Sequence, residues 1–150
     1  MNDKIVRNKN IAEQINRTIE DIWIVLEKKE RAYTNIKLNN QQYVLLTLII
    51  RHPFSSPTEL AEKMEITKSA VSQQLSKLER EGYISKVQDA HDKRAFSIGL
   101  GKKGLIYKKE LETFNQQILD EYTSKLSFEE LSNMLSSFQK LHELLDEQIK

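Results

Sequence analysis

The sequence contains no cysteine, and it has only 4 glycines and 2 prolines in 150 residues. Without thiols, disulfides, thiolate metal sites and thiol-based redox sensing are excluded. The 3 histidines are scattered along the chain, so we expect no metal site and no cofactor. The scarcity of glycine and proline, with 39% hydrophobic and 30% charged residues, is typical of one helix-rich globular domain.

Long apolar runs are also missing. No stretch approaches the roughly 18 apolar residues that cross a bilayer, and residues 1–10 are polar with mixed charge. We therefore expect a cytoplasmic protein that has no membrane partner. The sequence shows no Ser/His/Asp set, no glycine-rich phosphate loop and no paired carboxylates in a candidate cleft, so we do not expect an enzyme.

Charge is unevenly distributed, although the net charge is only +1. Residues 66–104 carry 8 basic and 4 acidic side chains, whereas residues 105–150 carry 5 basic and 9 acidic ones. A basic segment of this kind is expected where a protein faces a polyanion. The alternative is an ordinary solvated surface of mixed charge.

Hydrophobic spacing and capping residues predict the first helices. Apolar residues at helical spacing from Ile11 to about Arg31 predict a long amphipathic helix. Asn39 followed by Gln42 forms a capping box ahead of a second helix, which Pro53 ends.

Two further helices follow in close succession. Ser56-Pro57-Thr58-Glu59 combines an N-cap serine, a proline at the first helical position and a capping glutamate, which predicts a short helix over Pro57 to Met64. Thr67 caps the next helix, which runs to Glu81 and ends at Gly82.

The helix after Thr67 has two distinct faces. At about 100° per residue, Val71, Leu75 and Leu78 share one side and predict a buried face. The opposite side is polar and short, and it comprises Ser69, Gln73, Ser76 and Arg80, flanked by Ser72 and Lys77.

A hairpin and two helices complete the chain. Residues 83–87 and 96–100 alternate apolar and polar side chains, which predicts a β-hairpin with a charged tip over residues 89–94. We expect Asp89 and Asp92 to fix this tip and to hold Arg94 by ion pairing. Two long helices follow, one over about Lys102 to Lys125 and one after the capping Ser127.

The order of elements predicts a mainly α (α+β) fold. We expect it to consist of a winged helix-turn-helix headpiece and of long N- and C-terminal helices that form a dimerisation region. A short turn between two helices projects the outer face of the second one, and such a face suits the major groove of DNA. There Gln73 offers a donor and an acceptor to a base edge, while Lys68 and Lys77 neutralise phosphate. The hairpin tip is placed to enter the neighbouring minor groove. The predicted DNA-binding residues are Ser56, Thr58, Thr67, Lys68, Ser69, Ser72, Gln73, Ser76, Lys77, Arg80, His91, Lys93 and Arg94.

The stretch from Ser56 to Arg94 resembles the MarR family of bacterial transcription regulators, and the flanking helices extend the likeness along nearly the whole chain. Its most specific motif is the Asp-x-x-Asp-x-Arg sequence of residues 89–94. The resemblance implies one domain over residues 1–150, with a DNA-binding part over about 38–101 and dimerisation helices over about 8–33 and 102–150. It also implies an obligate homodimer on a pseudo-palindromic operator, and repression that a small ligand relieves.

The sequence departs from the family pattern at two positions. His91 stands where arginine is common, so the minor-groove contact falls to His91, to Lys93 or to Arg94. Gly101 replaces a threonine cap, from which we expect a looser start of the following helix.

Two questions remain open at this stage. A ligand between the dimer helices and the headpiece would meet aromatic walls from Trp23, Tyr33, Tyr43 and Phe54. The alternative to a repressor is a winged-helix protein-interaction module without sequence-specific DNA binding, and the residues do not decide between repression and activation.

Overall fold

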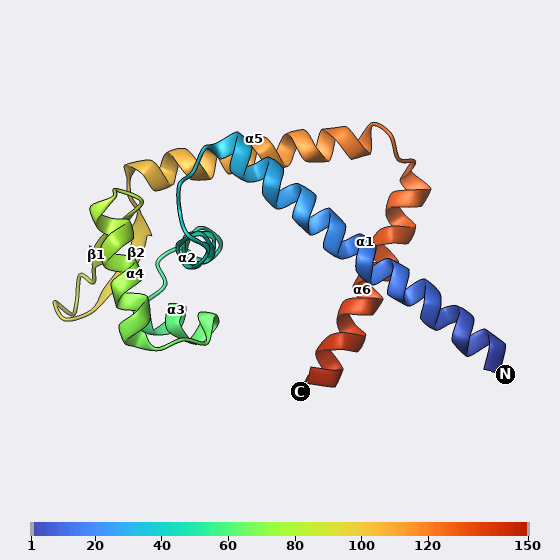
Figure 1. Ribbon diagram of the computed structural model, residues 1–150. Coiled ribbons are helices and arrows are strands. Elements are labelled where there is room, and N and C mark those ends of the chain that lie inside the picture. Colours follow the sequence, from blue (N-terminus) through green and yellow to red (C-terminus); the bar gives the residue numbers. More distant parts are fainter. Residues whose placement is uncertain (1, 150) are drawn as a thin grey trace. The chain divides into compact units, whose positions relative to one another are not determined.

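The computed structural model describes residues 2–149, which form a mainly helical chain with one two-stranded antiparallel sheet. The predicted fold class is confirmed. In chain order the elements are α1 (Asn2–Thr34), α2 (Asn40–Arg51), α3 (Pro57–Met64), α4 (Lys68–Arg80), β1 (Ile84–Gln88), β2 (Phe96–Leu100), α5 (Lys102–Thr123) and α6 (Phe128–Ile149) (Figure 1). Within the described part of the chain, no helix is both long enough and apolar enough to span a membrane.

The chain divides into two compact units, one ending at Leu111 and the other beginning at Glu112. The boundary falls inside α5, about ten residues later than the predicted boundary between headpiece and C-terminal helices. We call residues 38–101 the headpiece, and it lies entirely within the first unit together with α1. The second unit holds the rest of α5 and α6, and its last helix starts at a capping box in which the Ser127 hydroxyl accepts from the Glu130 backbone N–H.

The helices of the headpiece begin at the predicted caps. The Asn39 side chain accepts a hydrogen bond from the Gln42 backbone N–H at 2.9 Å, and Gln42 accepts one from Asn39 in return at 3.1 Å. Ser56 and Glu59 form the same reciprocal pair at the start of α3. The Thr67 hydroxyl accepts from the Ala70 N–H at 3.1 Å at the start of α4. Local hydrogen bonding therefore sets where each helix starts.

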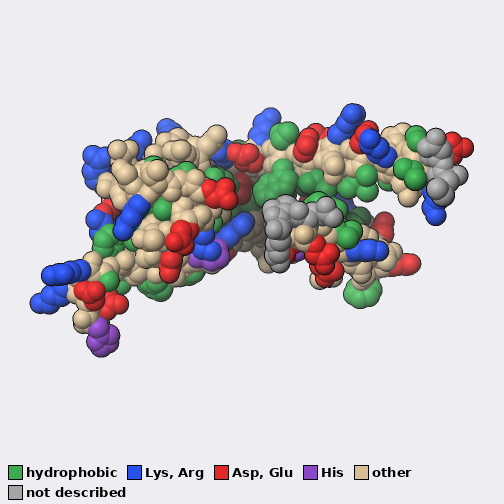
Figure 2. All heavy atoms as spheres, turned by 90° about the horizontal axis from the view of Figure 1, so that it is seen from below, with side chains coloured by type: hydrophobic (Ala, Val, Ile, Leu, Met, Phe, Trp, Pro, Cys, Tyr) green, Lys and Arg blue, Asp and Glu red, His purple; other side chains and the backbone are tan. Residues whose placement is uncertain are grey.

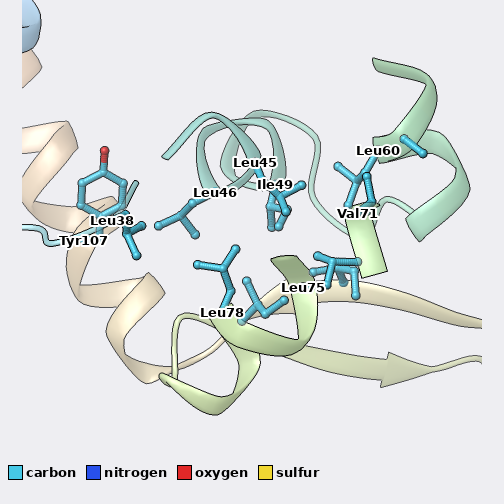
Figure 3. Packing of buried hydrophobic residues seen from close by; sticks show 12 residues of the cluster. Leu38, Leu45, Leu46, Ile49, Leu60, Val71, Leu75, Leu78 and Tyr107 are labelled. Atoms are coloured by element: carbon cyan, nitrogen blue, oxygen red, sulfur yellow. The ribbon is translucent and has the colours of Figure 1, made fainter. Parts of the chain in front are cut away.

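One hydrophobic core holds α2, α3 and α4 together with the hairpin. Figure 3 shows leucines and isoleucine of α2 facing leucines of α4, with Leu60 and Val71 at one end and Leu38 and Tyr107 at the other. The buried residues of this core are Leu38, Leu45, Leu46, Ile49, Leu60, Ala61, Val71, Leu75, Leu78, Ile84, Ile98 and Tyr107. Because α4 buries its apolar face here, its other face is turned outward.

The hairpin is anchored to the core at its base. Ile84 pairs with Leu100 and Gln88 with Phe96 in the antiparallel register, so the inward residues Ile84 and Ile98 are buried. The Ile98 backbone N–H also donates to the Ser55 carbonyl oxygen at 2.9 Å, which ties the hairpin to the segment before α3. We call β1, β2 and the loop between them the wing.

The start of α5 is tightly packed, so the expected loosening at Gly101 is wrong. A Cβ atom at Gly101 would lie 2.5 Å from the carbonyl oxygen of Gly82, and one at Gly104 would lie 2.0 Å from that of Tyr83. Real Cβ contacts are essentially never this short. The Gly101 N–H donates to the Tyr83 carbonyl at 2.9 Å. Glycine is required here because two backbone segments approach each other closely.

Helix α1 is longer than predicted, since it begins at Asn2 rather than near Ile11. Asp3 in its first turn favours the helix electrostatically. Among the described residues, α1 contributes no side chain to the buried core of the headpiece. Large apolar side chains on α1 stay exposed, and Figure 2 shows hydrophobic side chains along the helix that ends at the right of the view. They include Ile5, Ile11, Ile15, Ile22, Trp23 and Tyr33.

Candidate nucleic-acid interface

The outward face of α4 is polar and fully accessible, as predicted. Val71, Leu75 and Leu78 are at most 3% exposed. The predicted DNA-binding residues on the opposite face are all exposed: Lys68, Ser69, Ser72, Gln73, Ser76, Lys77 and Arg80. A helix that buries one face completely and presents hydroxyl, amide and cationic groups on the other has the surface that base edges and phosphates require.

The turn between α3 and α4 sets the direction in which α4 projects. Glu65 ends α3 in the left-handed region at φ 53°, and its backbone N–H donates to the last carbonyls of that helix. The Ile66 N–H donates to the Ala61 carbonyl at 3.2 Å, so the chain turns within three residues before Thr67 caps α4. A short, hydrogen-bonded turn of this kind is what makes the two helices a rigid helix-turn-helix.

The wing tip is held by its own carboxylates. Asp89 Oδ1 accepts from the backbone N–H groups of His91 at 2.7 Å and Asp92 at 3.1 Å. Asp92 Oδ1 accepts from the Arg94 backbone N–H at 2.9 Å. Both aspartates thus fix the loop, as predicted. The predicted ion pair between these aspartates and Arg94 is absent, because within residues 2–149 the Arg94 guanidinium has no salt-bridge partner.

The basic side chains of the wing are therefore available to a polyanion. His91, Lys93 and Arg94 are exposed at the tip. Figure 2 shows basic and histidine side chains projecting from the wing at the lower left, with acidic side chains beside them. Further along β1, Lys86 forms a salt bridge with Glu79 of α4 at 3.7 Å, which neutralises an acid that would repel phosphate.

Three predicted contact residues lie at the helix starts. The hydroxyls of Ser56 and Thr67 are hydrogen-bond acceptors in their caps. Each hydroxyl retains its proton as a donor, which a phosphate oxygen can accept. Thr58 is exposed on the first turn of α3. These residues bring two helix N-termini, with their positive partial charge, to the headpiece surface.

The four aromatic residues predicted to line a ligand site have different surroundings. Trp23 and Phe54 are 67% and 64% exposed, and Phe54 adopts a left-handed backbone at φ 62°. The Tyr43 hydroxyl donates to Glu30. A hollow of about 150 Å³ in the first unit is lined by none of the four; its walls are Thr34, Asn35, Ile36, Tyr83, Lys103, Ile106, Tyr107 and Glu110. In the described part of the chain no three acidic or histidine side chains cluster as a metal site would require.

Sequence reasoning missed a polar cluster between helices. Glu30 of α1 accepts hydrogen bonds from Tyr43 of α2 and Tyr107 of α5 through the same oxygen, Oε1. Burial, followed by interaction with Glu30, raises the pKa of Tyr43 to about 12. The same two causes raise the pKa of Tyr107, so both hydroxyls stay protonated donors. The one available signal was Glu30 itself, an acid within the apolar stripe of α1.

Comparison with known proteins gives consistent results at three levels. Residues 38–96 match the MarR family. The HTH-type transcriptional regulator BilQ of Clostridioides difficile is 32% identical over 75 residues, which is 50% of this chain and 51% of that protein. The uncharacterized HTH-type transcriptional regulator YwhA of Bacillus subtilis is 27% identical over 69% of this chain and 75% of its own length.

Solved structures show the same fold over most of the chain. FabT of Streptococcus pneumoniae, whose structure was determined in complex with DNA, matches 91% of this chain and 98% of its own with a TM-score of 0.74 and 23% identity. A MarR family protein from Bacillus stearothermophilus matches 92% and 97% with a TM-score of 0.73, also at 23% identity. Both curated relatives are HTH-type transcriptional regulators, and the two solved structures share the fold of this chain.

Proposed function

We propose that this chain, whose residues 38–96 match the MarR family, is a homodimeric, sequence-specific repressor of a pseudo-palindromic operator, and that a small molecule relieves the repression. The observation that carries this proposal is the outward polar face of α4 beside a cationic wing. Such a role requires the compartment that holds the DNA, so we propose a cytoplasmic protein. A winged-helix module that binds only proteins would not need a cationic face of this kind.

The interface divides into groups that read bases and groups that bind phosphate. Gln73 lies in the middle of the exposed face of α4, where its amide can pair with both a donor and an acceptor of a base edge. Lys68 and Lys77 stand on the flanks of this face and neutralise phosphates. Arg94 is exposed at the wing tip, and we propose that it enters the minor groove next to the major-groove site.

Exposed apolar surface supports the homodimer. The α1 stripe that includes Ile15, Ile22 and Trp23 has nothing within the first unit to cover it. In the second unit Leu135, Phe138 and Leu145 of α6 are likewise exposed. We propose that both stripes bury against a second copy of the chain, which then places two copies of α4 about 34 Å apart on one face of the duplex.

We also propose the chemical class of the small-molecule effector. Trp23, Tyr33, Tyr43 and Phe54 are the proposed aromatic contacts, which would suit a flat apolar molecule. Binding would relieve repression only if the molecule prefers the DNA-free arrangement of the helices. A compound that binds the protein and leaves operator affinity unchanged would exclude it as an effector.

The test is selection of bound duplexes from a random DNA pool, followed by affinity measurement at several salt concentrations. We expect a selected site with two related halves and an affinity that falls steeply with salt, because each neutralised phosphate releases counterions. Gln73→Ala should cost about 1–3 kcal/mol of binding and relax discrimination at one base position. Arg94→Ala should lower affinity and reduce the salt slope by about one.

Lys9→Ala is the matched control, since it removes one exposed charge outside the headpiece. A pool from which the wild type enriches no sequence would reject sequence-specific binding and favour the interaction module. Unchanged affinity in both the Gln73 and Arg94 variants would reject the interface drawn above.

A further inference from the structure

The first turn of α2 is a meeting point of three helices. Asn40 Oδ1 accepts from Arg31 Nη2 of α1 at 2.9 Å, and the Arg31 guanidinium lies 4.9 Å from the centre of the Tyr43 ring. Gln41 Oε1 accepts from Gln74 Nε2 of α4 at 3.1 Å. The residues of this turn therefore contact the end of α1 on one side and α4, the proposed recognition helix, on the other.

A carboxylate shared by two tyrosines joins α5 to this meeting point. Tyr107 is 2% exposed and donates to Glu30 Oε1 at 2.9 Å, and Tyr43 donates to the same oxygen. Hydrogen bonds to an ionised group inside a protein are stronger and more directional than neutral ones. One oxygen atom of α1 thus accepts hydrogen bonds from both α2 and α5, in addition to the contacts that Arg31 makes with α2.

This attachment matters because the apolar core of the described residues does not include α1. Within the described residues the apolar core of the headpiece runs from Ile36 to Leu111 and takes no side chain from α1. From Glu30 to Ile15 the helix extends about 22 Å at 1.5 Å per residue. A tilt of roughly 9° at Glu30 would therefore move Ile15 by about 3.5 Å, close to the rise of one base pair.

We propose that Glu30, Tyr43 and Tyr107 are positioning residues, whose shared oxygen holds α1 at one angle to the headpiece and so selects the spacing between operator half-sites. The inference rests on the proposed dimeric DNA-binding function, in which α1 carries the dimer surface and α4 reads the half-site. Removing the hydrogen bonds to Glu30 lets α1 tilt, so the two copies of α4 reach half-sites at more than one separation.

The experiment measures spacing tolerance with the full-length protein. The duplex that the wild type selects from a random pool is remade with one base pair inserted or deleted between its halves. For the wild type we expect each change to weaken binding on the order of 10-fold or more, because one recognition helix loses its register. For Tyr43→Phe, Tyr107→Phe and Glu30→Leu we expect a loss of roughly threefold or less, with weaker binding to the parent site.

Two further variants separate positioning from general stability. Glu30→Gln keeps an acceptor oxygen for both hydroxyls, so it should restore a spacing penalty close to that of the wild type. Tyr83→Phe removes a half-buried tyrosine hydroxyl for which the described residues show no hydrogen bond, and it should behave as the wild type. A change in stability alone would lower affinity for every duplex equally and leave the ratios unaltered.

The outcomes distinguish the two proposals. If the wild type enriches no site with paired halves, the dimeric function itself fails, and this inference fails with it. If the wild type enriches such a site but the folded Tyr43 and Tyr107 variants keep the full spacing penalty, only the positioning role is overturned. Loss of helical circular dichroism in all three cluster variants would also overturn it, because the cluster would then be a requirement for folding.

Discussion

Gly104→Ala should destabilise the protein, although helix propensity alone predicts the opposite. Gly104 is the third residue of α5, and alanine in a helix is favoured over glycine by about 1 kcal/mol. The structure shows why this preference is overruled. An added Cβ would lie 2.0 Å from the Tyr83 carbonyl oxygen and 3.1 Å from Leu100 Cδ2.

The magnitude follows from what has to move. Since real Cβ contacts essentially never fall under 3.0 Å, the backbone of α5 or of the turn before β1 must shift by about 1 Å. Overpacking costs roughly 1–3 kcal/mol, and the upper end applies because a backbone carbonyl cannot rotate away. After the gain in propensity, we expect a net loss of about 2 kcal/mol. For a chain of this length that corresponds to a melting temperature lower by about 4–8 °C.

Thermal unfolding followed by circular dichroism measures this loss. Wild type and variant must be compared at one protein concentration, because dimerisation would make the melting temperature concentration-dependent. Gly99→Ala is the matched control: its Cβ would meet Val87 Cγ2 at 3.2 Å, and this exposed side chain can adjust, so we expect little change. A Gly104→Ala protein that is as stable as the wild type would refute the close approach described here.

Three other predictions concern single side chains. Thr67→Ala removes the acceptor of the Ala70 N–H and should lower the free energy of unfolding by about 1 kcal/mol in a denaturant titration. Ile15→Glu should give a monomer in sedimentation, whereas Ile24→Glu, on the opposite side of α1, should stay dimeric; a dimeric Ile15 variant would contradict the proposed interface. Because the folded state raises the pKa of Tyr43 from 10.0 to about 12, it keeps a proton that the unfolded chain releases, so stability should fall as the pH rises from 10 to 12. Tyr43→Phe should show a shallower fall in melting temperature over that range.

The starts of the headpiece helices were predictable because their causes are local. Asn39, Ser56 and Thr67 each bond to a backbone group three residues along, and such contacts leave a signature in a short stretch of sequence. The outward face of α4 was predictable for a similar reason, since its period follows from helix geometry.

What the sequence did not show depends on residues far apart in the chain. Glu30 and Tyr107 are separated by 77 positions, and no periodicity relates them. The prediction of a looser helix start at Gly101 was wrong for the same reason. The sequence shows that a capping threonine is missing there, but it does not show that the carbonyl oxygen of Gly82 lies close by. The start of α1 was placed late, since residues 2–10 carry few apolar side chains to mark a helical stripe.

At the wing tip, the side chains that fix the loop are different from the side chains that are proposed to contact DNA. Its shape comes from Asp89 and Asp92, which bond only to main-chain N–H groups. A main-chain N–H is present whatever side chain a residue carries, unless that residue is proline. Positions 91 and 93 can therefore be exchanged for other side chains while the turn keeps its form. Under the proposed function, such exchanges would change the contacts that the wing makes with DNA and leave its backbone unchanged.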